Sequence, residues 1–176
     1  MITDRIHLAK HFAELGFQVG VEIGVCKGEY SSLLLASNPE LRLYSVDPWV
    51  AYGFRTQSWC DKEYSWAKHN LKKFGRRSII VRMTSMQALD LFPDESLDFV
   101  YIDGAHDFEN VYNDLCGWAP KVRPGGIVSG HDYLERTGSR GSVLGVVQAV
   151  DQYTDEQNIR FELTKEKLPS FYWVKK

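Results

Sequence analysis

Apolar residues along the chain form short continuous runs that alternate with stretches of helical periodicity. The short runs predict strands over residues 19–23, 41–47, 78–82, 97–103, 126–131, 160–163 and 171–174. Apolar positions three or four apart predict helices over residues 3–15, 31–36, 61–74 and 108–119, a short helix before Pro93, and a last helix with Val143 and Val150 on its inner face. Strand and helix alternate throughout, which predicts a single doubly wound α/β domain over residues 1–176 with helices on both faces of a mostly parallel sheet.

A glycine-spaced turn joins the first of these strands to the helix that follows. Gly24 and Gly28 carry no side chain, so a cofactor can lie directly against the backbone. The spacing is Gly-x-x-x-Gly, whereas dinucleotide sites have Gly-x-Gly-x-x-Gly. Glu22 lies at the end of the strand, where a carboxylate would repel a pyrophosphate and attract a cation. The turn therefore predicts a positively charged cofactor.

A second acid, Asp47, ends the next predicted strand, about 20 residues beyond the turn. At that place a carboxylate can accept both ribose hydroxyls of an adenosine-containing cofactor. The same carboxylate could instead cap the turn before Pro48. Its pairing with the glycine turn favours the ribose.

Residues 49–60 carry many aromatic side chains in an irregular segment. Loops with this much apolar surface usually cover something. A lid over a substrate and packing against the next helix both agree with the pattern, and exposed aromatics near Trp49 and Trp59 could equally serve an oligomer.

Acids and histidines follow the fourth and fifth predicted strands. Asp103 and His106 follow the fourth, and His131 and Asp132 follow the fifth. Because neighbouring parallel strands end at one edge of the sheet, we expect these four side chains to converge. Two carboxylates and two imidazoles suit either a divalent metal or general-base catalysis.

Composition excludes several classes of protein. The formal net charge is −2, which gives no overall attraction to nucleic acid or to an anionic membrane. No apolar run is long enough to cross a bilayer. The 3 cysteines are far apart and form no Cys-x-x-Cys pair, which is typical of a reduced, cytoplasmic protein.

Four stretches occur in an order that resembles the class I S-adenosylmethionine-dependent methyltransferases. They are Glu22-Ile-Gly24-Val-Cys-Lys-Gly28, Ser45-Val-Asp47-Pro-Trp49, Ile102-Asp103-Gly104-Ala-His106, and Gly125-Gly126-Ile-Val-Ser-Gly-His131-Asp132-Tyr133. The chain is most similar to the small-molecule O-methyltransferases with an Asp-Gly-x-His motif after strand four. The resemblance covers residues 15–174 and implies a Rossmann-like seven-stranded sheet whose last strand is antiparallel.

The resemblance also implies roles for individual residues. The methionine end of the cofactor would contact the glycine turn and Glu22, the ribose would contact Asp47, and the adenine would lie just past strand three. With the acid after strand four, the expected cofactor-binding residues are Glu22, Gly24, Gly28, Asp47, Ser85, Met86 and Asp103. In related metal-dependent enzymes an acid after strand four and two acidic or amide residues after strand five bind magnesium, and Asp103, His131 and Asp132 occupy those places.

The histidine departs from that pattern. Magnesium prefers oxygen ligands, so His131 points to manganese, iron or zinc, or to no metal. Without a metal, His106 or His131, with an ordinary pKa of about 6.5, would remove the proton of the acceptor, and Asp103 completes the expected catalytic set.

By this resemblance the expected function is methyl transfer from S-adenosylmethionine to a small-molecule acceptor, at a hydroxyl oxygen, with or without a divalent metal. A non-catalytic module that binds the cofactor as a partner or sensor is the alternative, and the acids and imidazoles count against it. The absent middle glycine and Glu22 count against a Rossmann oxidoreductase.

Overall fold

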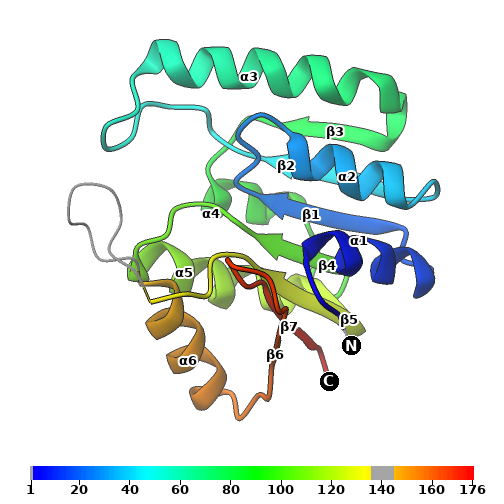
Figure 1. The fold of residues 1–176 in the computed structure, drawn as a ribbon, viewed down its shortest axis with the longest axis vertical. Helices are drawn as coiled ribbons and strands as arrows, with labels where there is room; N and C mark the ends of the chain where they lie inside the picture. Colours follow the sequence, from blue (N-terminus) through cyan, green and yellow to red (C-terminus); the bar gives the residue numbers. More distant parts are fainter. Residues whose placement is uncertain (1, 136–144) are drawn as a thin grey trace.

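Seven strands form one sheet in the order β3-β2-β1-β4-β5-β7-β6 in the computed structural model, which describes residues 2–135 and 145–176 (Figure 1). The strands are β1 Val19–Ile23, β2 Arg42–Val46, β3 Ser78–Val81, β4 Leu97–Ile102, β5 Val122–Gly130, β6 Glu162–Leu163 and β7 Phe171–Val174. Strands β1 to β5 are parallel to their neighbours, and β7 is antiparallel to β5 and β6. The predicted Rossmann-like α/β sheet with an antiparallel last strand is confirmed.

Helices cover both faces of the sheet (Figure 1). They are α1 Arg5–Glu14, α2 Glu29–Ser37, α3 Gln57–Leu71, α4 Ser85–Ala88, α5 Phe108–Trp118 and α6 Val146–Glu156. Successive residues of a strand point to opposite faces. Accordingly, Phe99 of β4 packs with α1 and α2, while Val100 packs with α5 and α6.

Two helices bury only part of the face expected for them, together with residues that were not expected. The periodicity of α1 predicts that Ile6 and Ala13 point inward with Ile2 and Ala9, but Leu8, Ala9 and Phe12 are buried and Ile6 is half exposed. Phe12 decides the rotation, because its ring stacks on Phe99 with centroids 4.2 Å apart.

In α5 the predicted inner positions Phe108 and Cys116 are exposed, whereas Asp114 and Trp118 are buried. A buried acid on this helix could not be foreseen from hydrophobic spacing.

Element ends differ by a few residues from the predicted ones. Helix α3 starts at Gln57 because the side chain of Thr56 accepts a hydrogen bond from the backbone N–H of Trp59, so the irregular segment is shorter than predicted. Strand β5 starts at Val122, before the predicted 126. Most of the glycine-rich loop predicted at 134–142, and Val143 beyond it, lie outside the described residues.

The order of the strands locates a crevice for a ligand. The chain runs outward from β1 to β2 and β3, then crosses to the other side of β1 to form β4 and β5. Ligands of doubly wound sheets bind at the carboxyl ends of strands where the order reverses, here between β1 and β4. In the described part of the chain, no helix has the length and apolar character that a membrane crossing requires.

Candidate active site

The glycine turn after β1 is shaped by contacts with its own protein. Gly24 has a φ of +87°, and a Cβ added to it would lie 2.1 Å from the carbonyl oxygen of Asp103. Gly28 has a φ of +74°, and its added Cβ would lie 3.2 Å from the side chain of Leu71 on α3. Both glycines therefore allow close packing and a left-handed backbone. From the sequence both glycines were expected to contact the cofactor, and that role stays a prediction.

We expect Gly24→Ala to lower the free energy of unfolding by more than about 3 kcal/mol, because it adds a backbone clash to an unfavourable φ. Urea unfolding monitored by circular dichroism measures the effect. Gly16→Ala is the matched control: Gly16 also has a positive φ, +71°, but among the described residues no atom beyond its two chain neighbours lies within 4 Å of its added Cβ. The control should cost only about 1 kcal/mol, and equal costs for both variants would contradict the packing role of Gly24.

Glu22 is buried near the carboxyl end of β1, on the sheet face covered by α1 and α2. Its carboxyl accepts a hydrogen bond from the hydroxyl of Ser31, which in turn accepts one from Ser45 at 3.0 Å. Burial raises the pKa of Glu22 to about 8. In the free protein at neutral pH this carboxyl is mainly uncharged, and a neighbouring cation would favour its ionised form.

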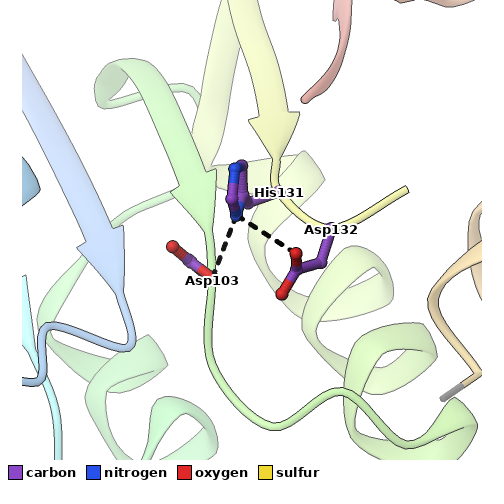
Figure 2. Close-up of side chains that lie close together, drawn as sticks. All are labelled: Asp103, His131 and Asp132. Atoms are coloured by element: carbon purple, nitrogen blue, oxygen red, sulfur yellow. Dashed lines mark ion pairs between the residues drawn. The ribbon is translucent and has the colours of Figure 1, made fainter. Parts of the chain in front are cut away.

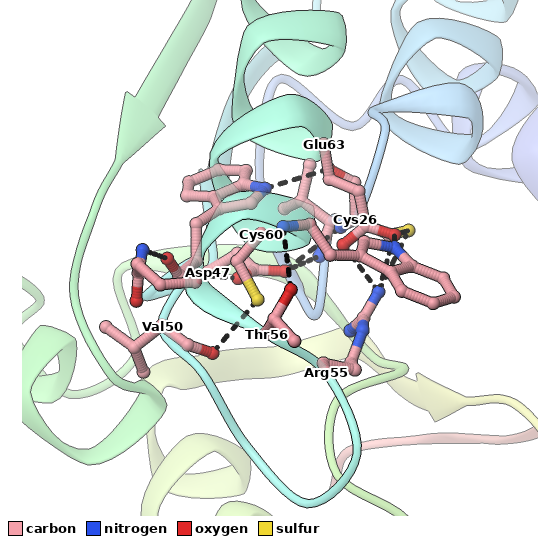
Figure 3. Close-up of polar contacts among 11 residues, drawn as sticks. Cys26, Asp47, Val50, Arg55, Thr56, Cys60 and Glu63 are labelled. Carbon is pink, nitrogen blue, oxygen red and sulfur yellow. Dashed lines mark hydrogen bonds and ion pairs between the residues drawn. The ribbon is translucent and has the colours of Figure 1, made fainter.

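Asp47 uses its carboxylate to hold two turns together. Oδ2 accepts the backbone N–H groups of Val25 and Cys26 at 3.1 and 3.0 Å, and Oδ1 accepts that of Trp49 at 2.7 Å (Figure 3). The turn-capping role is therefore present. Each carboxylate oxygen has further acceptor capacity, so these bonds are compatible with a ribose at the same place. Burial raises the pKa of Asp47 above its ordinary value.

The aromatic segment divides into a packed part and an exposed part. Trp49 is buried against Tyr64, and its indole N–H donates to the carbonyl oxygen of Cys26 at 2.8 Å. Tyr52, Phe54 and Trp59 are exposed. Packing against the next helix therefore accounts for Trp49, while the lid over a substrate stays a prediction for the rest.

A polar network ties this segment to the glycine turn (Figure 3). The buried carboxylate of Glu63 on α3 accepts hydrogen bonds from Arg55 at 2.7 Å, Trp59 at 2.8 Å and the thiol of Cys26 at 3.2 Å. The sequence did not single out Arg55 or Glu63, because the bonds join positions whose proximity depends on the fold. Burial raises the pKa of the Cys26 thiol to about 11, so this cysteine is a hydrogen-bond donor in the network.

The side chains of Asp103, His131 and Asp132, after β4 and β5, converge as predicted (Figure 2). Nδ1 of His131 lies 3.8 Å from Oδ1 of Asp103 and 3.6 Å from Oδ1 of Asp132. His131 and Asp132 are buried, and Asp103 is partly exposed. These side chains form one cluster at the carboxyl edge of the sheet.

His106 lies between the two carboxylates of this cluster. Its Nε2 is 3.1 Å from Oδ2 of Asp132 and 3.4 Å from Oδ1 of Asp103. Burial by itself would lower the pKa of His106, but hydrogen bonds and the charges of Asp103 and Asp132 outweigh burial and raise it to about 9. The ordinary pKa assumed for this histidine from the sequence is therefore wrong for the free protein, in which His106 is mainly a cation at neutral pH.

Arg5 adds a second cation, which the sequence did not indicate. Its guanidinium lies 4.0 Å from Oδ2 of Asp103 and 5.3 Å from the centre of the Tyr30 ring. Its backbone is fixed as well, since its N–H donates to Glu166 at 2.8 Å and its carbonyl accepts from the Tyr30 hydroxyl at 3.1 Å. Helix α1 thus places a positive charge beside the cluster.

The residues predicted to contact adenine lie at the start of α4. The hydroxyl of Ser85 donates to Oδ1 of Asp114 and accepts the indole N–H of Trp118 at 2.7 Å. Met86 is half exposed. The structure thus connects Ser85 to a buried acid on α5.

Comparison with known proteins identifies the family. The model of a methyltransferase domain family matches residues 21–133, which is more than half of the chain. An uncharacterized protein of Sinorhizobium fredii, y4gI, is 38% identical over 64 residues, which make up 36% of this chain and 7% of that protein. The chain therefore corresponds to a small part of that relative's length.

Solved structures with the same fold carry different functions in their names. A candidate caffeoyl-CoA O-methyltransferase from Staphylococcus aureus has a TM-score of 0.74 at 15% identity, covering 100% of this chain and 86% of the other. An O-methyltransferase from Bacillus cereus in complex with S-adenosylhomocysteine has a TM-score of 0.70 at 17% identity, covering 97% and 80%. An rRNA methylase from Streptococcus thermophilus has a TM-score of 0.67 at 13% identity, covering 99% and 98%.

Likeness at this level of identity establishes the fold and leaves the acceptor open. The family assignment comes from the matched domain, which begins within β1 and ends at Tyr133, just past His131 and Asp132. The glycine turn, Asp47 and the acid–histidine cluster all lie inside it. The chain belongs to this methyltransferase domain family and is an S-adenosylmethionine-dependent methyltransferase.

Proposed function

We propose that the protein transfers a methyl group to a hydroxyl oxygen of a small-molecule acceptor. The observation that carries this proposal is the cluster of two carboxylates and two imidazoles at the ends of β4 and β5. A hydroxyl oxygen attacks a methyl group well only after losing its proton, and such a cluster can take that proton. The net charge of −2 favours a small acceptor over nucleic acid.

The cofactor would span the crevice at the carboxyl ends of the strands. Glu22, Gly24 and Gly28 are proposed for its methionine end, and Asp47 for its ribose. Ser85 and Met86 would contact the adenine, and Asp103 would lie near the sulfonium. The ammonium and sulfonium charges of the cofactor suit the carboxyl groups of Glu22 and Asp103, which supports this orientation.

The chemical roles follow from the contacts of His106. In its neutral form His106 accepts the proton of the acceptor hydroxyl, and the resulting imidazolium is stabilised by Asp103 and Asp132, whose carboxylates lie 3.4 and 3.1 Å away. The oxyanion then attacks the methyl carbon, the carbon–sulfur bond breaks, and its electron pair returns to sulfur as S-adenosylhomocysteine forms. His131 orients the same two carboxylates from the other side.

The donor set also fits a divalent metal. Donor atoms of Asp103, His131 and Asp132 all lie within 4.8 Å of one another. Ligands about 2.0–2.2 Å from one ion are separated by about 3–4 Å, so small adjustments would let these three hold it. One nitrogen and two oxygens favour manganese, iron or zinc over magnesium. When bound, the metal would lower the pKa of an acceptor hydroxyl as a Lewis acid.

His106 and a metal would compete for the same carboxylates. Asp103 Oδ1 lies 3.4 Å from Nε2 of His106 and 3.8 Å from Nδ1 of His131, so both histidines approach the same oxygen atom. Together with Arg5, the His106 cation already balances the charges of Asp103 and Asp132. On this charge balance we expect the free site to hold the His106 imidazolium in place of a metal, and we expect His106 to act as the base once it has lost that proton.

We expect the purified enzyme to form S-adenosylhomocysteine from S-adenosylmethionine when mixed with a panel of hydroxylated metabolites. Mass spectrometry of the product should place the new methyl group on oxygen, because His106 and its carboxylates are arranged to deprotonate a hydroxyl. Each active acceptor is paired with its O-methylated and deoxy analogues, which should be inert. Methylation of nitrogen or carbon in the product would contradict the proposal.

A second part of this experiment tests whether activity requires a divalent metal. Activity should persist after dialysis against EDTA, because the proposed base is His106, which needs no metal to accept the proton. Activity lost in EDTA and restored by Mn²⁺ would instead assign Asp103, His131 and Asp132 to a metal.

A further inference from the structure

The guanidinium of Arg5 is a partly exposed positive charge at the edge of the acid–histidine cluster. Its side chain is 39% exposed, and Nη1 lies 4.0 Å from Oδ2 of Asp103, which is too far for a hydrogen bond. The group also lies over the ring of Tyr30. Within residues 2–135 and 145–176, no acceptor forms a hydrogen bond with this guanidinium. Its donors are therefore available to a ligand.

Arg123, near the amino end of β5, has a similar setting but uses its donors within the protein. Its side chain is 43% exposed and its guanidinium lies 5.5 Å from the centre of the Phe17 ring. Nε donates to Asp98 at 2.7 Å, and Nη1 donates to the carbonyl oxygen of Pro124 at 3.1 Å. Exposure and ring contact are thus alike in the two arginines, and the hydrogen bonds distinguish them.

The backbone of Arg5 is held in place by hydrogen bonds on both sides. Its N–H donates to Oε1 of Glu166 at 2.8 Å, and the hydroxyls of Thr164 and Ser170 donate to the same oxygen at 3.0 and 3.3 Å. Its carbonyl oxygen accepts the hydroxyl of Tyr30 at 3.1 Å. A side chain on a fixed backbone loses less conformational freedom when it binds a ligand.

The chain between β6 and β7 holds Arg5 on the side of the cluster that faces away from the proposed cofactor site. In this chain segment, Lys165 donates its backbone N–H to the carbonyl oxygen of Thr3 at 2.9 Å. Its other end accepts the backbone N–H of Tyr133, just after the cluster, at the carbonyl oxygen of Pro169. Strands β6 and β7 lie beyond β5, whereas the proposed ribose contact Asp47 follows β2 on the other side of β4. Arg5 therefore borders the space left for the acceptor.

The carboxylate of the cofactor's methionine end has another binding group within reach. Helix α2 begins directly after Gly28, with no side chain of the described residues capping it. The first backbone N–H groups of a helix have no partners within the helix, and they favour an anion. Since the methionine end is proposed to lie on this turn, Arg5 is left for the acceptor.

We propose that Arg5 binds a carboxylate of the acceptor, so that the substrates of the enzyme are small hydroxy acids. A planar guanidinium can donate two parallel hydrogen bonds to a carboxylate. Asp103 contacts both Arg5 and His106, so an acceptor held at Arg5 would bring a nearby hydroxyl to the proposed base. One guanidinium beside two carboxylates suits a singly charged group better than a doubly charged phosphate. This inference rests on the proposed function, methyl transfer to a hydroxyl oxygen at this cluster.

Matched pairs of acceptors test the proposal. Each pair combines a hydroxy acid with its carboxamide, which keeps the hydroxyl and the shape but lacks the charge; the acids are the ortho, meta and para hydroxybenzoates, lactate, glycerate and every other acid methylated in the metabolite panel. We expect the preferred acid to have a kcat/KM at least about 50-fold above that of its amide. In Arg5→Gln this ratio should fall below about 5, and Arg5→Lys, which keeps the charge but not the planar fork, should be intermediate.

Two controls separate acceptor binding from other roles of Arg5. Arg123→Gln removes an arginine of similar exposure and should keep the wild-type ratio. Calorimetry with S-adenosylhomocysteine should show no loss of affinity in Arg5→Gln. A loss of at least about tenfold, with an unchanged acid-to-amide ratio, would assign Arg5 to the cofactor's own carboxylate and overturn the proposal.

The remaining outcomes distinguish this inference from the proposed function. If acids and amides are methylated on oxygen at similar rates, Arg5 does not select the acceptor, while the proposed function stands. If no compound is methylated, the proposed function fails, and calorimetric titration of the acids and amides into the enzyme loaded with S-adenosylhomocysteine still tests Arg5. Acids that bind no more tightly than their amides contradict the proposal. If Arg5→Gln does not fold, an unchanged ratio in Arg5→Lys contradicts it.

Discussion

Asp103→Asn should reduce methyl transfer at least about 100-fold while changing the affinity for S-adenosylhomocysteine less than tenfold. Asp103 contacts both histidines of the cluster, His106 and His131, and also lies beside Arg5. The substitution removes its charge but keeps its shape. The backbone N–H of residue 103 still donates to the carbonyl oxygen of Ile23, so the end of β4 stays in place.

The same variant has a readout that needs no acceptor. Asp103 and Asp132 together raise the pKa of His106 to about 9. Without the charge of Asp103 this pKa should fall, and NMR titration of the His106 ring can follow it. The control is Asp98→Asn, at the far end of the same strand, which should leave both turnover and the His106 pKa unchanged. Full turnover in Asp103→Asn would remove the cluster from the mechanism.

Glu22→Gln should stabilise the free enzyme at pH 8 and weaken its binding of the cofactor at least tenfold. Burial raises the pKa of Glu22 to about 8, well above its ordinary 4.5. The stability that this group contributes is therefore fully present below about pH 4.5 and is lost as the pH rises through about 8. Glutamine is neutral throughout, so the variant avoids the loss, which is on the order of a few kcal/mol.

Binding of the cofactor should favour the wild-type glutamate over glutamine at position 22. The cofactor's ammonium would favour the ionised form of Glu22, so wild-type binding at pH 7 should release close to one proton. Calorimetry in buffers of different ionisation enthalpy measures that proton, and Glu22→Gln should release almost none. If the variant binds as tightly as the wild type, Glu22 does not contact the methionine end.

A second buried glutamate provides a control of opposite sign. Hydrogen bonds from Cys26, Trp59 and Arg55 outweigh the burial of Glu63 and lower its pKa below the ordinary value. Its stabilising contribution is present above the ordinary pKa and is lost as the pH falls. Glu63→Gln should therefore destabilise the enzyme at pH 8, where Glu22→Gln stabilises it. Thermal unfolding of both variants at pH 5 and pH 8 gives the comparison.

The first and last residues of a strand were predicted correctly where the apolar run that forms it has clear ends. Strands β1 and β7 begin and end at the predicted residues, because each is a short apolar run between clear breaks. The face of α1 was predicted correctly for Ile2 and Ala9 but not for Ile6, because several apolar residues on a short helix fit more than one rotation. The contact between Phe12 and Phe99, which are far apart in sequence, selects one of them.

In the candidate site, too, residues at strand ends could be predicted from the sequence, whereas residues that act through contacts far apart in the chain could not. The convergence of Asp103, His131 and Asp132 followed from parallel strands ending at one edge. Arg5, Glu63 and Asp114 were missed, since each acts through partners whose proximity is created by folding. For Asp114 the hydrophobic spacing of α5 carried no signal, because acids on a helix are usually exposed.

Periodicity and motifs along the chain were enough to predict the fold class, the methyltransferase resemblance and the positions of the acids and glycines. The tertiary structure alone decided the state of those groups. It placed His106 between two carboxylates, which makes it a cation, and buried Glu22, which makes it neutral. It also showed that residue 24 has no room for a side chain, because the backbone of Asp103 occupies the space that a Cβ would fill. The protonation state of a side chain and the space around a residue depend on the atoms that lie next to it, and only folding brings those atoms together.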